Sequence, residues 1–158
     1  MPSATRWKPS VTVAAVIEQD GRFLLVEEHT ADGLRLNNPA GHLDPGESLQ
    51  QAVVREVLEE TACTFTPVHL LGTYLARLQR GEQDITYLRF AFTGTVGPPA
   101  PGRALDDGIV RTLWLTPGEI EASRERHRSP LLWRCVQDHL AGRRYPLELL
   151  STDGSIGR

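Results

Sequence analysis

Three glutamates lie close together in a segment that the sequence predicts to be helical. Glu56, Glu59 and Glu60 fall within about two turns, and at roughly 100° per residue they share one arc of the helix. Like charges at these spacings repel by about 0.2–0.5 kcal/mol per pair. Only Arg55, four residues before Glu59, offsets that repulsion. Oxygen ligands on a rigid element suit Mg²⁺, with Mn²⁺ as a substitute, so we expect a divalent-cation site.

An acidic helix face is most often solvated surface, and three glutamates alone favour that interpretation. The surrounding pattern is longer and reads G-x5-E-x7-R-E-x2-E-E. Its fixed positions are Gly41, Glu47, Arg55, Glu56, Glu59 and Glu60. Six restricted positions at this spacing rarely coincide by chance, so the pattern favours a functional site.

The local sequence predicts where this helix begins and how it docks. Pro45-Gly46 breaks the chain, and Ser48 with Gln51 three residues later matches a capping box. An apolar stripe of Leu49, Val53 and Val57 docks the helix. The acids then lie on the adjoining flank, at the edge between the core and a cleft.

The rest of the chain predicts a single α+β domain. Strands are expected at Val11–Ile17, Phe23–Glu27, Val68–Leu78, Thr86–Thr95 and Ile109–Leu115. Turns or loops are expected at Gln19–Gly21, Ala31–Gly33 and Gln79–Asp84, and Leu34–Asn38 leads into the acidic pattern. A short helix begins at Pro117, and a last helix runs from Ser129-Pro130 to about Ala141. The expected limits are a flexible arm at 1–8, the domain at 9–150 and a tail at 151–158.

The net charge, the cysteines and the apolar content limit which partners and which cell compartment are expected. The net charge of −3, without a basic stripe, argues against binding to a nucleic-acid polymer. Cys63 and Cys135 form neither a metal spacing nor a disulfide framework, which is typical of a reducing cytosol. No apolar run approaches membrane-spanning length. We therefore expect a cytoplasmic protein, monomeric or homodimeric, that acts on a small molecule.

The acidic pattern resembles the signature of the Nudix hydrolases, which cleave a diphosphate linked to another moiety. The resemblance implies an α/β/α sandwich around a mixed sheet, with the acidic helix beside the active-site cleft. It also implies Mg²⁺ held by Glu56, Glu59 and Glu60, with contributions from Glu47 and the carbonyl of Ala40. One position departs from the family pattern: Ala62 stands where the family has a glycine that lets the chain leave the helix. An alanine forced into that conformation would cost about 1–2 kcal/mol, unless the chain leaves the helix differently.

Catalytic roles are expected for Arg55, Glu56 and Glu59, with Arg55 orienting a glutamate by a charge-assisted hydrogen bond. An ordinary surface ion pair is the alternative for Arg55. The general base is either a glutamate of the helix or a loop acid. The loop candidates are Glu82, Asp84, Asp106 and Asp107.

Segments beyond the signature, including YLRFAF and RSPLLWRC, resemble the bacterial NudJ subgroup of phosphatases. That resemblance implies hydrolysis of nucleoside di- and triphosphates, or of thiamine pyrophosphate and its hydroxymethylpyrimidine pyrophosphate precursor, with release of phosphate. Candidate substrate contacts are Asn37, Asn38, Gly41 and His42, with Arg77 and Arg89 for a terminal phosphate. Candidate aromatic walls are Trp7, Tyr74, Tyr87, Phe90 and Trp133, for all of which core or hairpin packing is the alternative.

Three other functions remain open from the sequence. The first is a Nudix hydrolase for a nucleotide sugar, a dinucleoside polyphosphate or an oxidised nucleotide. The second is a non-catalytic nucleotide-binding module on the same fold, which commonly lacks some of the acids that are all present here. The third is a solvated acidic helix on an unrelated α+β protein.

Overall fold

The computed structural model describes residues 4–158, so the first three residues of the expected N-terminal arm lie outside the described residues. The strands are β1 (Ser10–Val16), β2 (Glu18–Gln19), β3 (Arg22–Thr30), β4 (Gly33–Asn37), β5 (Ala40–His42), β6 (Phe65–Arg80), β7 (Gln83–Val96) and β8 (Ile109–Leu115). The helices are α1 (Leu49–Thr61), α2 (Pro117–Ala122) and α3 (Leu131–Leu140), with 3-10 turns η1 (Arg124–Arg126) and η2 (Leu147–Leu149). Within the described part of the chain, every helix is too short or too polar to cross a membrane.

The strands form two sheets. One has the order β5-β1-β7-β6, and its central strands β1 and β7 are parallel while its other pairs are antiparallel. In the other sheet, β3 pairs antiparallel with β2, β4 and β8. The mixed sheet predicted from the resemblance is therefore confirmed.

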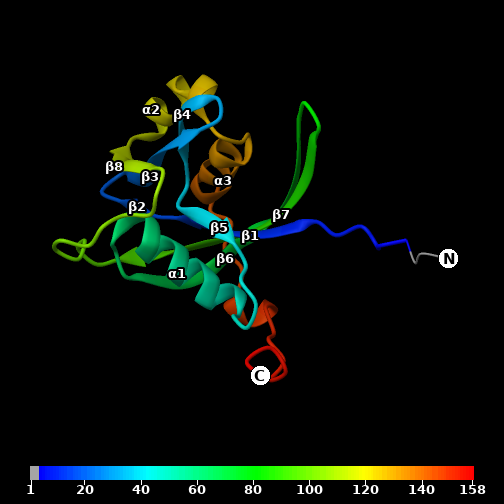
Figure 1. The fold of residues 1–158 in the computed structure, drawn as a ribbon. Coiled ribbons are helices and arrows are strands. Elements are labelled where there is room, and N and C mark those ends of the chain that lie inside the picture. Colours follow the sequence, from blue (N-terminus) through cyan, green and yellow to red (C-terminus); the bar gives the residue numbers. More distant parts are fainter. Residues whose placement is uncertain (1–3) are drawn as a thin grey trace.

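Helices cover both faces of the strands, as Figure 1 shows for α1 and α3. Alternate residues of a strand point to opposite faces, and β1 follows this rule. Val13 and Ala15 pack with the α1 side chains Val53 and Val57 in one core cluster. Val16 packs in a second cluster with α2 and α3 side chains. Two cores with strands between them give the predicted α/β/α sandwich.

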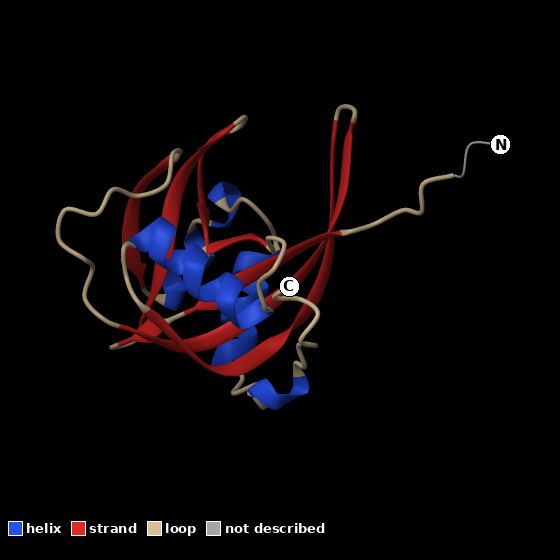
Figure 2. Cartoon of the chain, turned by 60° about the horizontal axis from the view of Figure 1, so that its bottom comes forward, coloured by secondary structure: helices blue, strands red, loops and turns tan. Residues whose placement is uncertain are grey.

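The hairpins are tighter and longer than the sequence pattern predicted. β6 and β7 pair all the way to Arg80 and Gln83, so the polar segment expected to be a wide turn is largely strand. This end of the hairpin projects beyond the body (Figure 2), and residues 79–84 at its tip are all exposed. Likewise, residues 31–33 make a tight turn, and the stretch leading into the acidic pattern is the strand β4.

Helix α1 begins with the predicted capping box. The Gln51 N–H donates to Ser48 Oγ at 3.1 Å, and the Ser48 N–H donates to Gln51 Oε1 at 2.8 Å. The helix ends at Thr61 because Ala62 takes φ 61° and ψ 12°, a left-handed conformation. Ala62 therefore leaves the helix as the family glycine would, at a cost of about 1–2 kcal/mol for its Cβ.

We expect Ala62→Gly to change the free energy of unfolding by less than about 1 kcal/mol. Relief of strain is offset by greater freedom of the unfolded chain, about 0.4–1 kcal/mol, and by the loss of one buried methyl, about 0.8 kcal/mol. Ala62→Val should destabilise by at least about 2 kcal/mol, because a β-branched residue tolerates positive φ poorly and the site is buried.

Urea unfolding measures both changes. The control is Ala141→Gly, because Ala141 has φ −73° and gains no relief from the substitution. That variant should lose about 0.5–1 kcal/mol. Equal stability of the Ala62→Gly and Ala62→Val variants would contradict the strained exit.

Candidate active site

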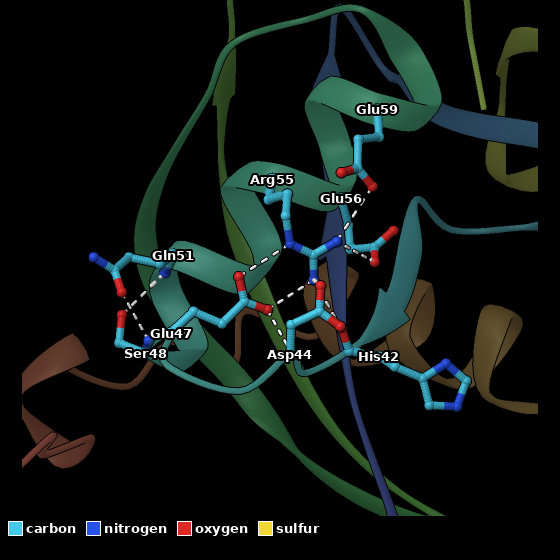
Figure 3. Close-up of polar contacts among 8 residues, drawn as sticks. All are labelled: His42, Asp44, Glu47, Ser48, Gln51, Arg55, Glu56 and Glu59. Carbon is cyan, nitrogen blue, oxygen red and sulfur yellow. Dashed lines mark hydrogen bonds and ion pairs between the residues drawn. The ribbon is translucent and has the colours of Figure 1, made fainter. Parts of the chain in front are cut away.

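Arg55 is the centre of the polar network on α1 (Figure 3). Its Nε and Nη2 donate to the two carboxylate oxygens of Glu47 at 3.0 and 2.7 Å. Its Nη1 donates to Glu56 at 2.7 Å and to Glu59 at 3.2 Å, and Nη2 also donates to the His42 carbonyl at 2.9 Å. The contact expected between Arg55 and a glutamate of the helix is present, and the pair with Glu59 is only one part of it.

The network favours the charged forms of Glu47 and Arg55. The Arg55 hydrogen bonds hold the pKa of Glu47 below its usual range, assisted by the Asp44 N–H, which donates to Glu47 at 2.7 Å. The pKa of Arg55 is raised in return, first by Glu47 and then by Glu56. Glu47 thus forms the bidentate ion pair with Arg55, and this single guanidinium also donates to Glu56 and Glu59.

Gly41 lets the Glu56 carboxylate lie against the backbone of β5. A Cβ built on Gly41 would stand 2.0 Å from Glu56 Cδ, which no side chain can occupy without displacing that carboxylate. Burial raises the pKa of Glu56, and the hydrogen bond from Arg55 opposes that rise. Gly41 does not have a positive φ, so its backbone conformation does not require a glycine. A glycine is required here because the Glu56 carboxylate occupies the space that a Cβ would need.

A third acid joins this cluster from the loop between β7 and β8. Carboxylate oxygens of Glu56, Glu59 and Asp106 all lie within 4.8 Å of one another. The Asp106 N–H donates to the Glu59 carbonyl at 2.9 Å, and the Ala100 N–H of the same loop donates to the Ala62 carbonyl at 2.8 Å. The loop thus uses carbonyls that the helix end leaves without partners, and this brings Asp106 to the acids.

Glu60 follows Glu59 on α1, but its carboxylate contacts the backbone of β5 and does not belong to the cluster. The residue is only 7% exposed, and its carboxylate accepts a hydrogen bond from the Ala40 N–H at 2.7 Å. Burial raises its pKa to about 8, and the charges of Glu28, Glu56 and Asp106 contribute to the rise. The structure therefore places Glu60 and Ala40 together, while the three acids that converge are Glu56, Glu59 and Asp106.

A cavity of about 710 Å³ opens beside the acids, on the face of the sheet that carries α3. Of the three clustered acids, Glu56 lines it, as do Gly41 and His42 among the predicted substrate contacts. The cavity wall carries more cations than carboxylates. Its lining arginines are Arg35, Arg77, Arg80, Arg89 and Arg128, against Asp32 and Glu56. A cavity of this size and charge suits an anionic small molecule.

The aromatic candidates for the substrate-binding wall lie in different parts of the structure. Of the aromatic residues, Tyr87 lines the cavity, with its ring centroid 6.2 Å from that of His42. Trp133 lies in the core cluster beneath α3, and Phe90 packs against the other core cluster, beneath α1. The Tyr74 hydroxyl donates to Asp138, and Trp7 is exposed.

The polar candidates also lie in different parts of the structure. Arg77 pairs with Asp84 on the exposed hairpin. Arg89 is buried and donates to Asn37 and Asn38. Neither Asp107 nor Glu82 belongs to the acidic cluster found among residues 4–158.

The fold and this arrangement of acids define a class of protein. Residues 6–134 match the NUDIX domain family, and the chain belongs to that family. It is therefore a hydrolase of phosphoanhydride bonds in small molecules, as its relatives are. Nudix hydrolases generally use divalent metals, and the carboxylate cluster is a donor set that fits one.

One curated relative and two solved structures illustrate how similar this chain is to known proteins. The chain is 38% identical over 146 residues to Phosphatase NudJ of Escherichia coli strain K12, covering 91% of this chain and 92% of that protein. The structure of a Nudix hydrolase from Nitrosomonas europaea matches with a TM-score of 0.86 and 51% identity, over 92% of this chain and 98% of that one. A UDP-X diphosphatase matches with a TM-score of 0.70 at 19% identity, over 92% and 69%, which shows the fold alone.

We predict that Asp106→Asn weakens Mn²⁺ binding by at least about tenfold, because cation affinity depends on the number of charged ligands. Electron paramagnetic resonance of free Mn²⁺ measures the affinity. The neighbouring Asp107→Asn is the matched control, since it removes the same charge one residue outside the cluster. Equal weakening in both variants would indicate a general charge effect and contradict the ligand role.

Glu60 should make the metal-free protein less stable as pH rises. Between about 4.5 and about 8 the folded protein keeps a proton on Glu60 that the unfolded chain has lost. The free energy of unfolding therefore falls across this window, by at least about 1 kcal/mol, since one pKa unit corresponds to about 1.4 kcal/mol. Glu60→Gln cannot titrate, yet its side-chain oxygen can still accept from Ala40, so the slope should flatten.

Urea unfolding in EDTA at a series of pH values measures this slope. Glu125→Gln, a change at an exposed residue outside the acidic cluster, is the control and should retain the wild-type slope. A wild-type slope in Glu60→Gln would show that other groups cause the pH dependence.

Proposed function

We propose that this protein uses Mg²⁺ to hydrolyse the diphosphate linkage of nucleoside di- and triphosphates, or of thiamine pyrophosphate or its hydroxymethylpyrimidine pyrophosphate precursor, with release of phosphate. One observation carries the proposal: three carboxylates and Arg55 converge beside an arginine-lined cavity. Hard oxygen donors favour Mg²⁺, and Mn²⁺ is the substitute.

The metal would be held by Glu56, Glu59 and Asp106, with Glu60, Glu47 and the Ala40 carbonyl as the further ligands expected from the family pattern. Of these, Glu47 already accepts two hydrogen bonds from Arg55 with its two carboxylate oxygens, so we assign it the smallest contribution. When bound, it supplies charge neutralisation at the phosphoryl oxygens and lowers the pKa of a coordinated water. This role for the cluster explains why the helix tolerates several acids with one arginine.

The residues of the chain have separate tasks in this proposal. Arg55 fixes the rotamers of Glu56 and Glu59 through its Nη1 hydrogen bonds, so that the cluster is preorganised. Glu59 is the more exposed of the two, at 32% against 12% for the side chain, and we assign it acceptance of the water proton. Gly41 and His42 line the cavity where the substrate phosphates pass.

The substrate class rests on the cavity and on the relatives. Five arginines line the cavity, and two of them, Arg35 and Arg89, have no carboxylate partner among residues 4–158, which suits an anionic substrate. Tyr87 offers one aromatic surface to a base or pyrimidine ring. The Escherichia coli and Shigella flexneri relatives, both 38% identical, carry the name phosphatase. Release of orthophosphate from a terminal position agrees with that name better than the splitting of a substrate into two monophosphates.

We predict Mg²⁺-dependent release of orthophosphate from thiamine pyrophosphate or from the common nucleoside di- and triphosphates. Glu59→Gln should lower turnover by about 100-fold or more, because it removes a ligand charge and the proton acceptor. A malachite-green assay with and without EDTA measures the release. Glu121→Gln, on an exposed position of α2, is the matched control.

Two outcomes would contradict the proposal at different levels. Turnover only on a nucleotide sugar, a dinucleoside polyphosphate or an oxidised nucleotide would retain the Nudix chemistry and overturn the substrate class. Full activity of Glu59→Gln would overturn the assignment of the cluster.

A further inference from the structure

Arg89 is a buried cation without a matching anion. It lies in the central strand β7, is 5% exposed and still lines the cavity. Across residues 4–158, none of the ion pairs includes Arg89. Arginine stays protonated in proteins, so this side chain cannot avoid the cost of burial by losing its charge. Buried charges are normally paired or reserved for a ligand.

The partners that Arg89 has are neutral acceptors. Nη1 donates to Asn38 Oδ1 at 3.0 Å and, at 3.9 Å, to Cys135 Sγ, while Nη2 donates to Asn37 Oδ1 at 3.3 Å. A guanidinium has five N–H donors, so Nε–H and one Nη2–H have no partner among these contacts. Nε and Nη2 together match two oxygens of one phosphate. The two asparagines hold the Arg89 guanidinium in place, but they are neutral and do not compensate its positive charge.

The other arginines of the cavity differ from Arg89. Arg77 pairs with Asp84, Arg80 with Asp32 and Arg128 with Glu28. Arg35 donates from Nη1 to the carbonyl of Glu125, and like Arg89 it belongs to none of the ion pairs found among residues 4–158. Its buried Nε also has no hydrogen-bond partner there, but the residue as a whole is less deeply buried than Arg89. Of the two cavity arginines without a carboxylate partner, Arg89 is therefore the more deeply buried and the one that most requires an incoming anion.

Strand register relates Arg89 to the acids. His42, Thr12 and Arg89 stand directly opposite one another on β5, β1 and β7, and all three line the cavity. Strands are spaced by about 4.8 Å, so Arg89 lies two strands, roughly 10 Å, from the strand that carries Gly41 and adjoins Glu56. This separation places the cation at a different part of a bound substrate from the carboxylate cluster.

We propose that Arg89, held by Asn37 and Asn38, binds the phosphoryl group of the substrate that is remote from the metal cluster. The inference rests on the proposed function and makes it more specific, because it requires at least two phosphoryl groups on the substrate. The amide oxygens of both asparagines face Arg89, so these residues act by positioning the guanidinium.

The test is pyrophosphate binding in EDTA, measured by isothermal titration calorimetry, so that no metal contributes. Wild-type protein should bind, and Arg89→Met should weaken binding by about 10- to 100-fold, the range for a charge-assisted hydrogen-bonded contact. Arg77→Met is the matched control, because it removes a cation of the same cavity that already has a carboxylate partner. It should weaken binding by less than Arg89→Met does.

A second variant keeps the test decisive if Arg89→Met fails to fold. Asn38→Asp has nearly the same shape and supplies the missing carboxylate beside Nη1. In the absence of anions it should raise the unfolding temperature, and it should weaken pyrophosphate binding as Arg89→Met does. A purely structural Arg89 would instead give lower stability in Arg89→Met with unchanged pyrophosphate binding in Asn38→Asp.

The outcomes separate this inference from the proposed function. Glu59→Gln should lose metal-dependent turnover yet still bind pyrophosphate in EDTA. Wild-type turnover in Glu59→Gln would overturn the proposed function irrespective of Arg89. Absence of pyrophosphate binding to the wild-type protein, or unchanged binding in either Arg89→Met or Asn38→Asp, would overturn the role of Arg89.

Discussion

The site depends on how one guanidinium is shared among several carboxylates. Arg55 reaches Glu47, Glu56 and Glu59 at once, so it fixes their geometry without cancelling their charge. Its bidentate contact is with Glu47, so one guanidinium is shared among three carboxylates. Carboxylates held this close together repel one another, so the cluster favours binding of a divalent cation, whose positive charge offsets the repulsion. Preorganisation and residual charge thus follow from the same interaction.

Two backbone features let that interaction form. Gly41 has no Cβ, and its position admits the Glu56 carboxylate. Ala62 turns the chain into a left-handed conformation at the end of α1, and the carbonyls of Glu59 and Ala62 accept from the loop that carries Asp106. The strain at Ala62 is small beside the contacts that this exit allows. Beyond the cluster, the parallel pairing of β1 with β7 carries Arg89 to the cavity floor.

Much of this could be predicted from the sequence where the signal is local or periodic. The capping box at Ser48, the apolar stripe of α1 and the contact of Arg55 with Glu59 all follow from spacing along one helix. The tip of the β6–β7 hairpin could not be predicted as strand, because residues 79–84 are polar and exposed and such a run is equally typical of a turn. Asp106 appeared only as one of four loop acids, since its place depends on a backbone hydrogen bond across the fold. The burial of Arg89 likewise arises from strand pairing, which no local pattern encodes.

The central claim is that Glu56, Glu59 and Asp106 form one cation site that serves the arginine-lined cavity. Anomalous diffraction from crystals soaked with Mn²⁺ and a non-hydrolysable nucleoside triphosphate analogue tests it most directly. We expect an anomalous peak within coordination distance of all three carboxylates, with the analogue's phosphates between that peak and Arg89. A peak elsewhere, or an analogue bound outside the cavity with these carboxylates unliganded, would contradict the account.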